Sequence, residues 1–323
     1  MPLRLSIIIP FYNVEPYIAE CLDSVYQQDI PEEEYEVICV NDASPDHSRD
    51  IVEYYQKKHP NLVLVDHEIN KKLGAARNTG RSIAKGNYIW NVDSDDKIMP
   101  NCLGKMLRLC EENDLDVLEF ATIRFCGEKV GNMGHVRLTE GVVSGLDFME
   151  QLGSAELSQM CVVWRRMIRR AFLDENHIFS PKINMGEDVP YSFKVLMSAK
   201  RMMVISDRCY CYRMNPESLT GEKWEPTPHT LYEKCFLNSR MIYDVAMEVP
   251  EQYVNVRESY LDVARYTLSR YVKYVPRMSS HDRKEFKKLC RKALFSNSFI
   301  RDLLSIKRYA RYQLWLLGLK SLP

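Results

Sequence analysis

The chain has 323 residues, of which 46% are hydrophobic and 27% are charged, as in a globular protein that buries a sizeable core. Its formal net charge is zero, which argues against a nucleic-acid partner. The charges are uneven, however, because residues 277–323 contain 12 Lys and Arg against three Asp and Glu. A basic C-terminal region on an otherwise acidic chain indicates that this region binds an anionic surface or acceptor.

Ten cysteines are scattered along the chain, several of them inside apolar runs where a reduced cysteine behaves as a small hydrophobe. This usage favours a reducing compartment. The N-terminal apolar run is too short for a secretory signal, and no apolar stretch approaches the ~18 to 20 residues of a membrane span. We therefore expect a cytoplasmic protein.

Short apolar runs alternate with segments of helical periodicity through the first part of the chain. The runs predict strands at 5–10, 36–40, 62–66, 88–92 and 117–125. Such alternation is typical of an α/β fold, Rossmann-like, with a mainly parallel central sheet flanked by helices. The pattern is mixed from 126 to about 215, where we expect a loop or hairpin, a helix and a strand.

From residue 230 onward the sequence predicts helices only. We therefore expect an α/β domain over 1–220 and a helical C-terminal region over 221–323. Residues 301–320 mix leucines and Trp315 with basic side chains, as in an amphipathic helix lying on an anionic membrane surface. The sequence leaves open a second interpretation, in which these helices cover the sheet edge and only their outer face is basic.

Polar residues follow the predicted strands at the edge where parallel sheets bind their ligands. One edge is expected to collect an aromatic ring, cations and carboxylates: Pro10, Tyr12, Asn13, Asn41, Asp42, Ser44, Lys71, Lys72, Arg77, Asn78, Asp93, Asp95 and Asp96. This set suits a nucleotide diphosphate held with Mg²⁺ or Mn²⁺, because one or two carboxylates plus phosphate oxygens are common ligands of these ions.

Several of these residues have structural interpretations that the sequence leaves open. Asp42 and Ser44 are suited to capping the next helix. Asp96 is better explained as a cap or first-turn acid of the helix that follows it than as a metal ligand. Asp93 and Asp95 could form a plain acidic loop, but the polar residues at the other strand ends favour a ligand-binding role for them.

Four segments resemble the family 2 glycosyltransferases with the GT-A fold: SIIIPFYNVEPYIAECLDSVYQQ, EVICVNDASPDHS, LGAARNTG and IWNVDSDD. The resemblance covers roughly residues 5–215. It implies that Pro10, Tyr12 and Asp42 form the pocket for the nucleotide base of a sugar donor. It also implies that Arg77 lies close to the nucleotide.

The family's D-x-D element corresponds to Asp93, near the ribose and metal, and Asp95, the main protein ligand of Mn²⁺ or Mg²⁺. MGEDVPYSF (185–193) resembles the family's Gly-Glu-Asp element, which implies Asp188 as catalytic base and Glu187 as support on the acceptor side. An inverting transfer needs such a carboxylate to take the proton of the acceptor hydroxyl. From the residues alone, Glu187 and Asp188 are equally suited to capping the following helix.

Two further positions have alternatives: Trp164 either faces the acceptor or lies in the core, and Arg213 either meets the diphosphate on loop closure or forms an ion pair. Together these features predict an inverting, metal-dependent transferase that moves a sugar from a nucleotide donor, expected to be UDP-linked, to a glycan or lipid-linked acceptor in polysaccharide synthesis. A nucleotidyltransferase would need a glycine- and cation-rich loop after the first strand, where this chain has PFYNVEPY. A non-catalytic nucleotide-sugar binder would be expected to lack Asp95 or Asp188.

Overall fold

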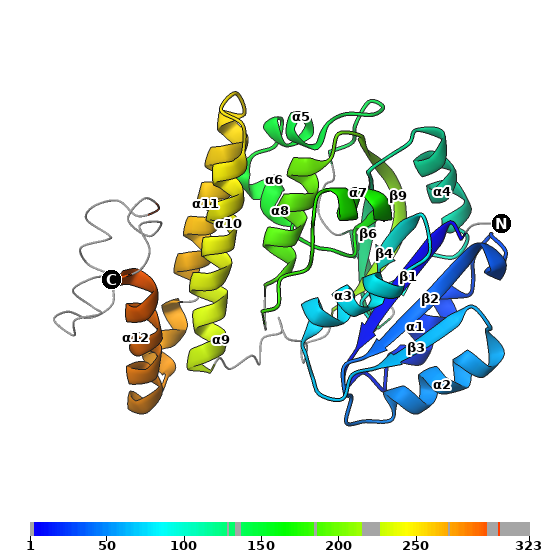
Figure 1. Ribbon diagram of the computed structural model, residues 1–323, viewed down its shortest axis with the longest axis horizontal. Helices are drawn as coiled ribbons and strands as arrows, with labels where there is room; N and C mark the ends of the chain where they lie inside the picture. Colours follow the sequence, from blue (N-terminus) through cyan, green and yellow to red (C-terminus); the bar gives the residue numbers. More distant parts are fainter. Residues whose placement is uncertain are drawn as a thin grey trace.

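The computed structural model describes residues 3–127, 129–132, 137–183, 186–214, 227–270, 272–295 and 303. Within these residues, nine strands form one sheet in the order β3-β2-β1-β4-β8-β6-β9-β5, and β7 pairs with β6 (Figure 1). The strands are β1 Leu5–Phe11, β2 Tyr35–Asn41, β3 Leu62–Asp66, β4 Tyr88–Asn91, β5 Lys97–Ile98, β6 Val117–Cys126, β7 Lys129–Asn132, β8 Arg166–Arg169 and β9 Met202–Arg213.

Helices connect these strands and continue the chain beyond the sheet. Those between strands are α1 Ile18–Val25, α2 Ser48–Lys58, α3 Leu73–Ile83, α4 Leu103–Glu112, α5 Gly145–Glu150, α6 Ser154–Gln159, α7 Arg170–Glu175 and α8 Asp188–Ser198, with a 3₁₀ turn at Glu32–Glu34. After the sheet come α9 Pro228–Tyr232, a π-helical turn at Glu233–Leu237, α10 Asn238–Glu248, α11 Val254–Arg270, a 3₁₀ turn at Val272–Arg277 and α12 Ser280–Phe295.

The first four predicted strands are confirmed, and they run parallel. In the central strand, Ile8 pairs with Ile38 of β2 on one side and with Asn91 of β4 on the other. Alternate residues of β1 belong to two separate cores: Ile8 packs in the core that includes α3 and α8, and Ile7 in the core that includes α1, α2 and α4. Burial on both faces explains why these strands are continuously apolar.

Beyond β4 the sheet is mixed. β8 lies between β4 and β6 and is antiparallel to both, whereas β6 and β9 are parallel to each other. β4 and β6 are therefore not neighbours, because β8, a strand from later in the chain, separates them. The parallel arrangement expected from the sequence therefore holds only for strands β1 to β4 and for the β6–β9 pair.

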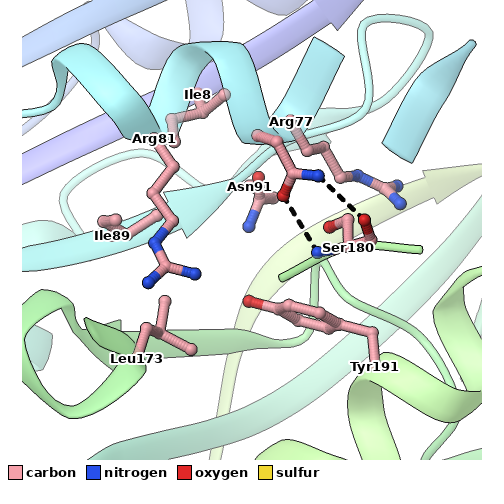
Figure 2. A pocket seen from close by; sticks show the side chains of 9 residues that line it. Ile8, Arg77, Arg81, Ile89, Asn91, Leu173, Ser180 and Tyr191 are labelled. Atoms are coloured by element: carbon pink, nitrogen blue, oxygen red, sulfur yellow. Dashed lines mark hydrogen bonds between the residues drawn. The ribbon is translucent and has the colours of Figure 1, made fainter. Parts of the chain in front are cut away.

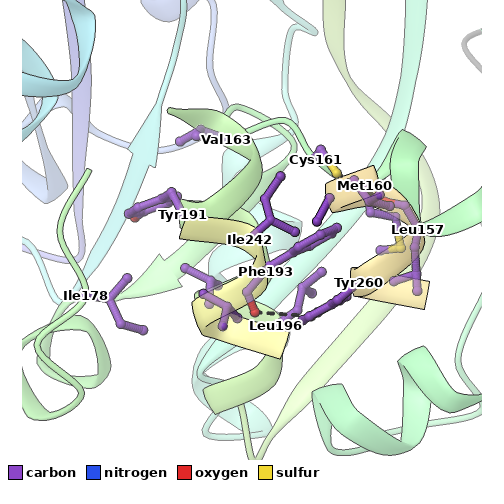
Figure 3. Close-up of a cluster of buried hydrophobic side chains, with 14 of the residues drawn as sticks. Leu157, Met160, Cys161, Val163, Ile178, Tyr191, Phe193, Leu196, Ile242 and Tyr260 are labelled. Carbon is purple, nitrogen blue, oxygen red and sulfur yellow. Dashed lines mark hydrogen bonds between the residues drawn. The ribbon is translucent and has the colours of Figure 1, made fainter. Parts of the chain in front are cut away.

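The C-terminal helices share a core with the sheet. α10 and α11 pack beside each other and against α8, between the sheet and α12 (Figure 1). Figure 3 shows the ring of Tyr260 on α11 stacked on Phe193 of α8, with centroids 3.9 Å apart, and Ile242 of α10 in the same cluster. The Tyr260 hydroxyl also donates to the Phe193 carbonyl oxygen at 3.3 Å. The helical region therefore completes the apolar core over α8.

Two predictions about this region fall on residues outside the described part. The boundary at 220/221 lies within 215–226, and the basic segment 301–320 is described only at Leu303. Among the described helices, none combines the length and apolar character that a bilayer crossing requires.

Replacing Tyr260, which is fully buried, tests the shared core. Tyr260→Ala is expected to lower the free energy of unfolding by ~3 to 5 kcal/mol, because it removes a large ring and leaves a cavity. Tyr260→Phe keeps the ring and loses only hydroxyl contacts, so its expected cost is ~1 kcal/mol. Denaturant unfolding measures both, and a small loss in the alanine variant would contradict a continuous core.

Candidate active site

A buried guanidinium lies at the centre of the site. Arg77 on α3 has only 2% of its side chain exposed, and its Nη1 donates to Glu187 Oε1 at 3.0 Å and to Asp188 Oδ1 at 2.6 Å. Its Nη2 donates to Asp93 Oδ1 at 2.9 Å. Burial lowers the pKa of Arg77, but the three carboxylates outweigh it and hold this pKa above its usual range.

Close packing of α3 on the loop before α8 explains this convergence. A Cβ on Gly74 would lie 2.2 Å from the Pro181 carbonyl oxygen, so only glycine allows the approach. The Asn78 amide donates to the Ser180 carbonyl at 2.8 Å and accepts from the Ser180 N–H at 2.9 Å (Figure 2). These bonds fasten the loop to the helix that carries Arg77.

Glu187 and Asp188 stand at the N-terminus of α8, as the sequence indicates. Glu187 occupies the N-cap position, but its side chain makes no capping bond and binds Arg77 instead. The capping interpretation is therefore wrong for its carboxylate. Asp188 lies in the first turn, where the helix dipole favours an anion, and 27% of its side chain is exposed. Burial first, and then repulsion from Asp188, raises the pKa of Glu187 to about 8.

The D-x-D segment is braced by β9. The Asp93 N–H donates to the Tyr210 hydroxyl oxygen at 3.1 Å, and that hydroxyl donates to Asp96 Oδ2 at 2.7 Å. Asp96 Oδ1 accepts from the Arg213 N–H at 2.6 Å. The expectation that Asp96 caps the following helix is wrong, since α4 begins only at Leu103 and Asp96 is 1% exposed and bonded to β9.

Asp95 lies between these two acids in the chain. Burial, followed by the charge of Asp93, raises the pKa of Asp95 to about 6, and burial also raises the pKa of Asp93 and of Asp96. Crowded carboxylates that repel one another supply oxygen atoms of the kind that divalent cations bind. Within the described residues, no three His, Cys, Asp or Glu side chains are grouped to hold a metal. An ion held by Asp93 and Asp95 would therefore need further ligands from outside these side chains, such as phosphate oxygens.

Arg213 forms the ion pair that the sequence left as one of two alternatives. Its Nη2 donates to Glu20 on α1, and its Nε donates to the Asp95 carbonyl oxygen at 2.7 Å. The guanidinium lies over the rings of Tyr17 and Phe125, 5.0 and 4.5 Å from their centroids. The alternative, contact with a diphosphate on loop closure, involves residues 215–226, outside the described part.

Trp164 is a core residue in this structure. It is 2% exposed and stacks on Tyr210 with ring centroids 4.4 Å apart and an interplanar angle of 8°. Its carbonyl oxygen accepts from Trp90 Nε1 at 2.7 Å. Trp164 thus supports the tyrosine that braces the D-x-D segment, and of its two interpretations the structure favours the core.

Asp42 organises the loop after β3. Its Oδ1 accepts from His67 Nδ1 and from the Lys71 N–H, both at 2.7 Å, and its Oδ2 accepts from the Lys72 N–H at 2.8 Å. Asp42 therefore does not cap α2, whose N-cap residue is His47. The carboxylate fixes the backbone around the position where the resemblance places the nucleotide base.

The other residues expected to line that pocket lie beside Asp42. The Asp42 N–H donates to the Phe11 carbonyl oxygen at 3.0 Å, which brings the ends of β1 and β2 together. Tyr12, directly after β1, is 47% exposed, whereas Pro10 is buried within the strand. Tyr12 thus presents an accessible ring at the sheet edge, whereas Pro10 belongs to the buried strand.

Sequence reasoning missed three supporting side chains: Tyr210, His67 and Glu20. Tyr210 and Asp96 are 114 positions apart, and no local pattern signals their contact. The alternating apolar residues of β9 predict a strand but do not indicate which neighbour that strand will have.

Comparisons with known proteins identify the family of this chain. The family model described as glycosyl transferase family 2 matches residues 6–176, so the chain belongs to that family. The uncharacterized glycosyltransferase EpsJ of Bacillus subtilis is 34% identical over 224 residues, 69% of this chain and 64% of EpsJ. The poly(ribitol-phosphate) beta-N-acetylglucosaminyltransferase TarS of Staphylococcus aureus is 31% identical over 252 residues, 76% of this chain and 42% of TarS. The matches thus span less than two thirds of either relative.

The fold is shared with a solved structure. The crystal structure of S. aureus TarS 1–349 in complex with UDP-GlcNAc aligns with a TM-score of 0.68 at 24% identity, covering 89% of this chain and 79% of that chain. The predicted GT-A fold is therefore confirmed.

Gly186, directly before Glu187, offers a test of the packing around Glu187 and Asp188. Its φ is +85°, and a Cβ there would lie 2.0 Å from Nδ2 of Asn238 on α10. Gly186→Ala is expected to lower the free energy of unfolding by ~2 kcal/mol or more, because it adds this overlap to the strain of a left-handed backbone. Gly141→Ala is a matched control, since its φ is +88° and nothing lies within 4 Å of its Cβ. If both variants lost the same free energy of unfolding, measured with denaturant, Asn238 of α10 would not be in close contact with Gly186.

Proposed function

We propose that this chain is an inverting, metal-dependent glycosyltransferase that moves a sugar from a nucleotide donor to a hydroxyl of a glycan or lipid-linked oligosaccharide in surface-polysaccharide synthesis. The observation that carries the proposal is the pair of acidic sites joined by Arg77, with Asp93 on one side and Asp188 on the other. Membership of glycosyl transferase family 2 supports the class of reaction.

A UDP-linked hexose or N-acetylhexosamine is the proposed donor. The relative TarS is named as an N-acetylglucosaminyltransferase, and the structure that shares this fold was solved with UDP-GlcNAc. In this chain, the exposed Tyr12 ring and the loop fixed by Asp42 offer a surface for the base. Arg77 is turned toward protein carboxylates, so its proposed role shifts from contacting the nucleotide to holding the residues around it.

Asp188 is the proposed base. It is partly exposed, it pairs with Arg77 Nη1 at 2.6 Å, and it lies in the first turn of α8. Asp188 would take the proton of the acceptor hydroxyl as that oxygen bonds to the anomeric carbon and the bond from this carbon to the diphosphate breaks.

Asp95, with Asp93 beside it, would hold Mn²⁺ or Mg²⁺. The chemistry that such an ion supplies is neutralisation of the charge that grows on the leaving diphosphate. The brace formed by Tyr210 and Arg213 keeps the Asp95 backbone in place for that role.

Asp95→Asn and Asp188→Asn test this assignment. Each is expected to lower turnover by ~100-fold or more, since a general base alone contributes about that factor. Asp95→Asn should also weaken metal-dependent donor binding, whereas Asp188→Asn should leave it largely intact. UDP release across a panel of sugar nucleotides, with and without Mn²⁺, measures turnover, and titration calorimetry measures binding.

The control for both variants is Asp50→Asn, whose side chain is 70% exposed on α2 and pairs with His47. Turnover at the wild-type level in both test variants would remove the site assignment. UDP release without glycosyl transfer to any acceptor would favour hydrolysis of the donor instead, and pyrophosphate release from a nucleoside triphosphate and a sugar phosphate would favour a nucleotidyltransferase.

The described part of the C-terminal region supports the proposed membrane contact. On α12, five cations recur at helical spacing on one face: Arg283, Lys284, Lys287, Lys288 and Arg291. Phe286 and Cys290 of the same helix are buried, on a neighbouring face. A basic face of this kind is attracted to anionic lipid head groups, at about 1 kcal/mol per cation near the surface.

Reversing two exposed charges on α12 tests the contact. Lys284→Glu/Lys288→Glu is expected to reduce sedimentation with vesicles containing phosphatidylglycerol, and wild-type binding should fall at high salt because ions screen the attraction. Lys57→Glu/Lys58→Glu, on the distant α2, is the matched control and should sediment like the wild type. Equal sedimentation of all three proteins would end this part of the proposal.

A further inference from the structure

The charges around Arg77 do not balance. One guanidinium donates to three carboxylates, so full ionisation would leave one positive charge against three negative ones, a net charge of −2. The Glu187 side chain is only 6% exposed and that of Arg77 only 2%. A buried excess of negative charge is costly, and the usual relief is that one acid keeps its proton.

Among the three acids, Glu187 is the one expected to stay protonated. Its side chain is the least exposed, at 6%, against 23% for Asp93 and 27% for Asp188. Glu187 and Asp188 also share a single nitrogen of Arg77, which brings the two carboxyl groups together. Burial and this neighbour both raise the pKa of Glu187.

We infer that Glu187 is a positioning residue: as a neutral acid it donates a hydrogen bond to Asp188 and leaves the charge of Arg77 to Asp93 and Asp188. This inference rests on the proposed function, in which Asp188 is the base. It replaces the expected acceptor-side role of Glu187 with one exerted through Asp188. The base then remains an anion that is held from two sides, by the guanidinium and by the acid.

The surroundings of Glu187 contain few other charged groups. Arg77 reaches it from α3, Asp188 follows it in the chain, and Asp93 lies across the same guanidinium. From α10, the neutral amide of Asn238 packs on the adjacent Gly186. Within the described residues, the proton on Glu187 is therefore governed chiefly by burial and by the Arg77–Asp188 pair.

Glu187→Gln and Glu187→Ala distinguish a neutral donor from a merely structural carboxylate. Glutamine keeps the shape and an N–H donor, so it should recover most of the activity that alanine loses. We expect kcat to fall about tenfold or more in Glu187→Ala and to stay within about fivefold of wild type in Glu187→Gln.

The pH profile gives the decisive comparison. Wild-type kcat should decline as the pH rises through about 8, because Glu187 then ionises beside Asp188, and this decline should be absent in Glu187→Gln. The inference would be overturned if kcat of Glu187→Gln were as low as that of Glu187→Ala and still declined above about pH 8 as in wild type.

Unfolding as a function of pH tests the same proton without relying on turnover. A folded-state pKa raised from 4.5 to about 8 means that the folded chain binds an extra proton between these values, so stability falls as the pH rises through this window. Glu187→Gln lacks this loss. The melting temperature of the variant minus that of wild type should therefore increase from pH 5 to pH 8.5. If the difference between the two melting temperatures does not change with pH, Glu187 is not protonated in the folded chain. If no sugar nucleotide is turned over but this gain is observed, the proposed function fails while the protonated Glu187 stands.

Discussion

The arrangement of the site depends on one buried cation. Arg77 connects the end of β4, the start of α8 and its own helix through bonds that span up to 111 positions of sequence. A guanidinium has five N–H donors in a rigid plane, so it can hold several carboxylates in a definite geometry where a lysine could not. Breaking such a buried group by removing the cation would leave carboxylates uncompensated in a low-dielectric interior.

A second, largely neutral set of contacts holds the acidic turn after β4. Tyr210 bonds to the backbone at Asp93 and to the side chain of Asp96, and Trp164 stacks on its ring. The Arg213 guanidinium then ties the same turn to Glu20 on α1. Repulsion between the acids is therefore opposed by fixed contacts to the backbone of the turn, which keep Asp95 at the sheet edge.

The sequence was informative where local pattern decides structure. Continuous apolar runs identified β1 to β4, and the polar residues at their ends do meet at one edge, as parallel strands require. It was uninformative where the outcome depends on distant partners. Asp96 resembles a helix cap in local sequence, yet it bonds to a tyrosine brought by β9. The family resemblance places Arg77 close to a nucleotide, but only the folded chain reveals that carboxylates surround it.

The stack between Phe193 and Tyr260 also bears on how the protein is made. These residues are 67 positions apart, so the apolar side of α8 leaves the ribosome well before the helix that covers it. At ~5 to 20 residues per second, the delay is roughly 3 to 13 seconds. During biosynthesis the nascent catalytic half therefore presents a hydrophobic surface, a natural binding site for chaperones until α10 and α11 have been translated.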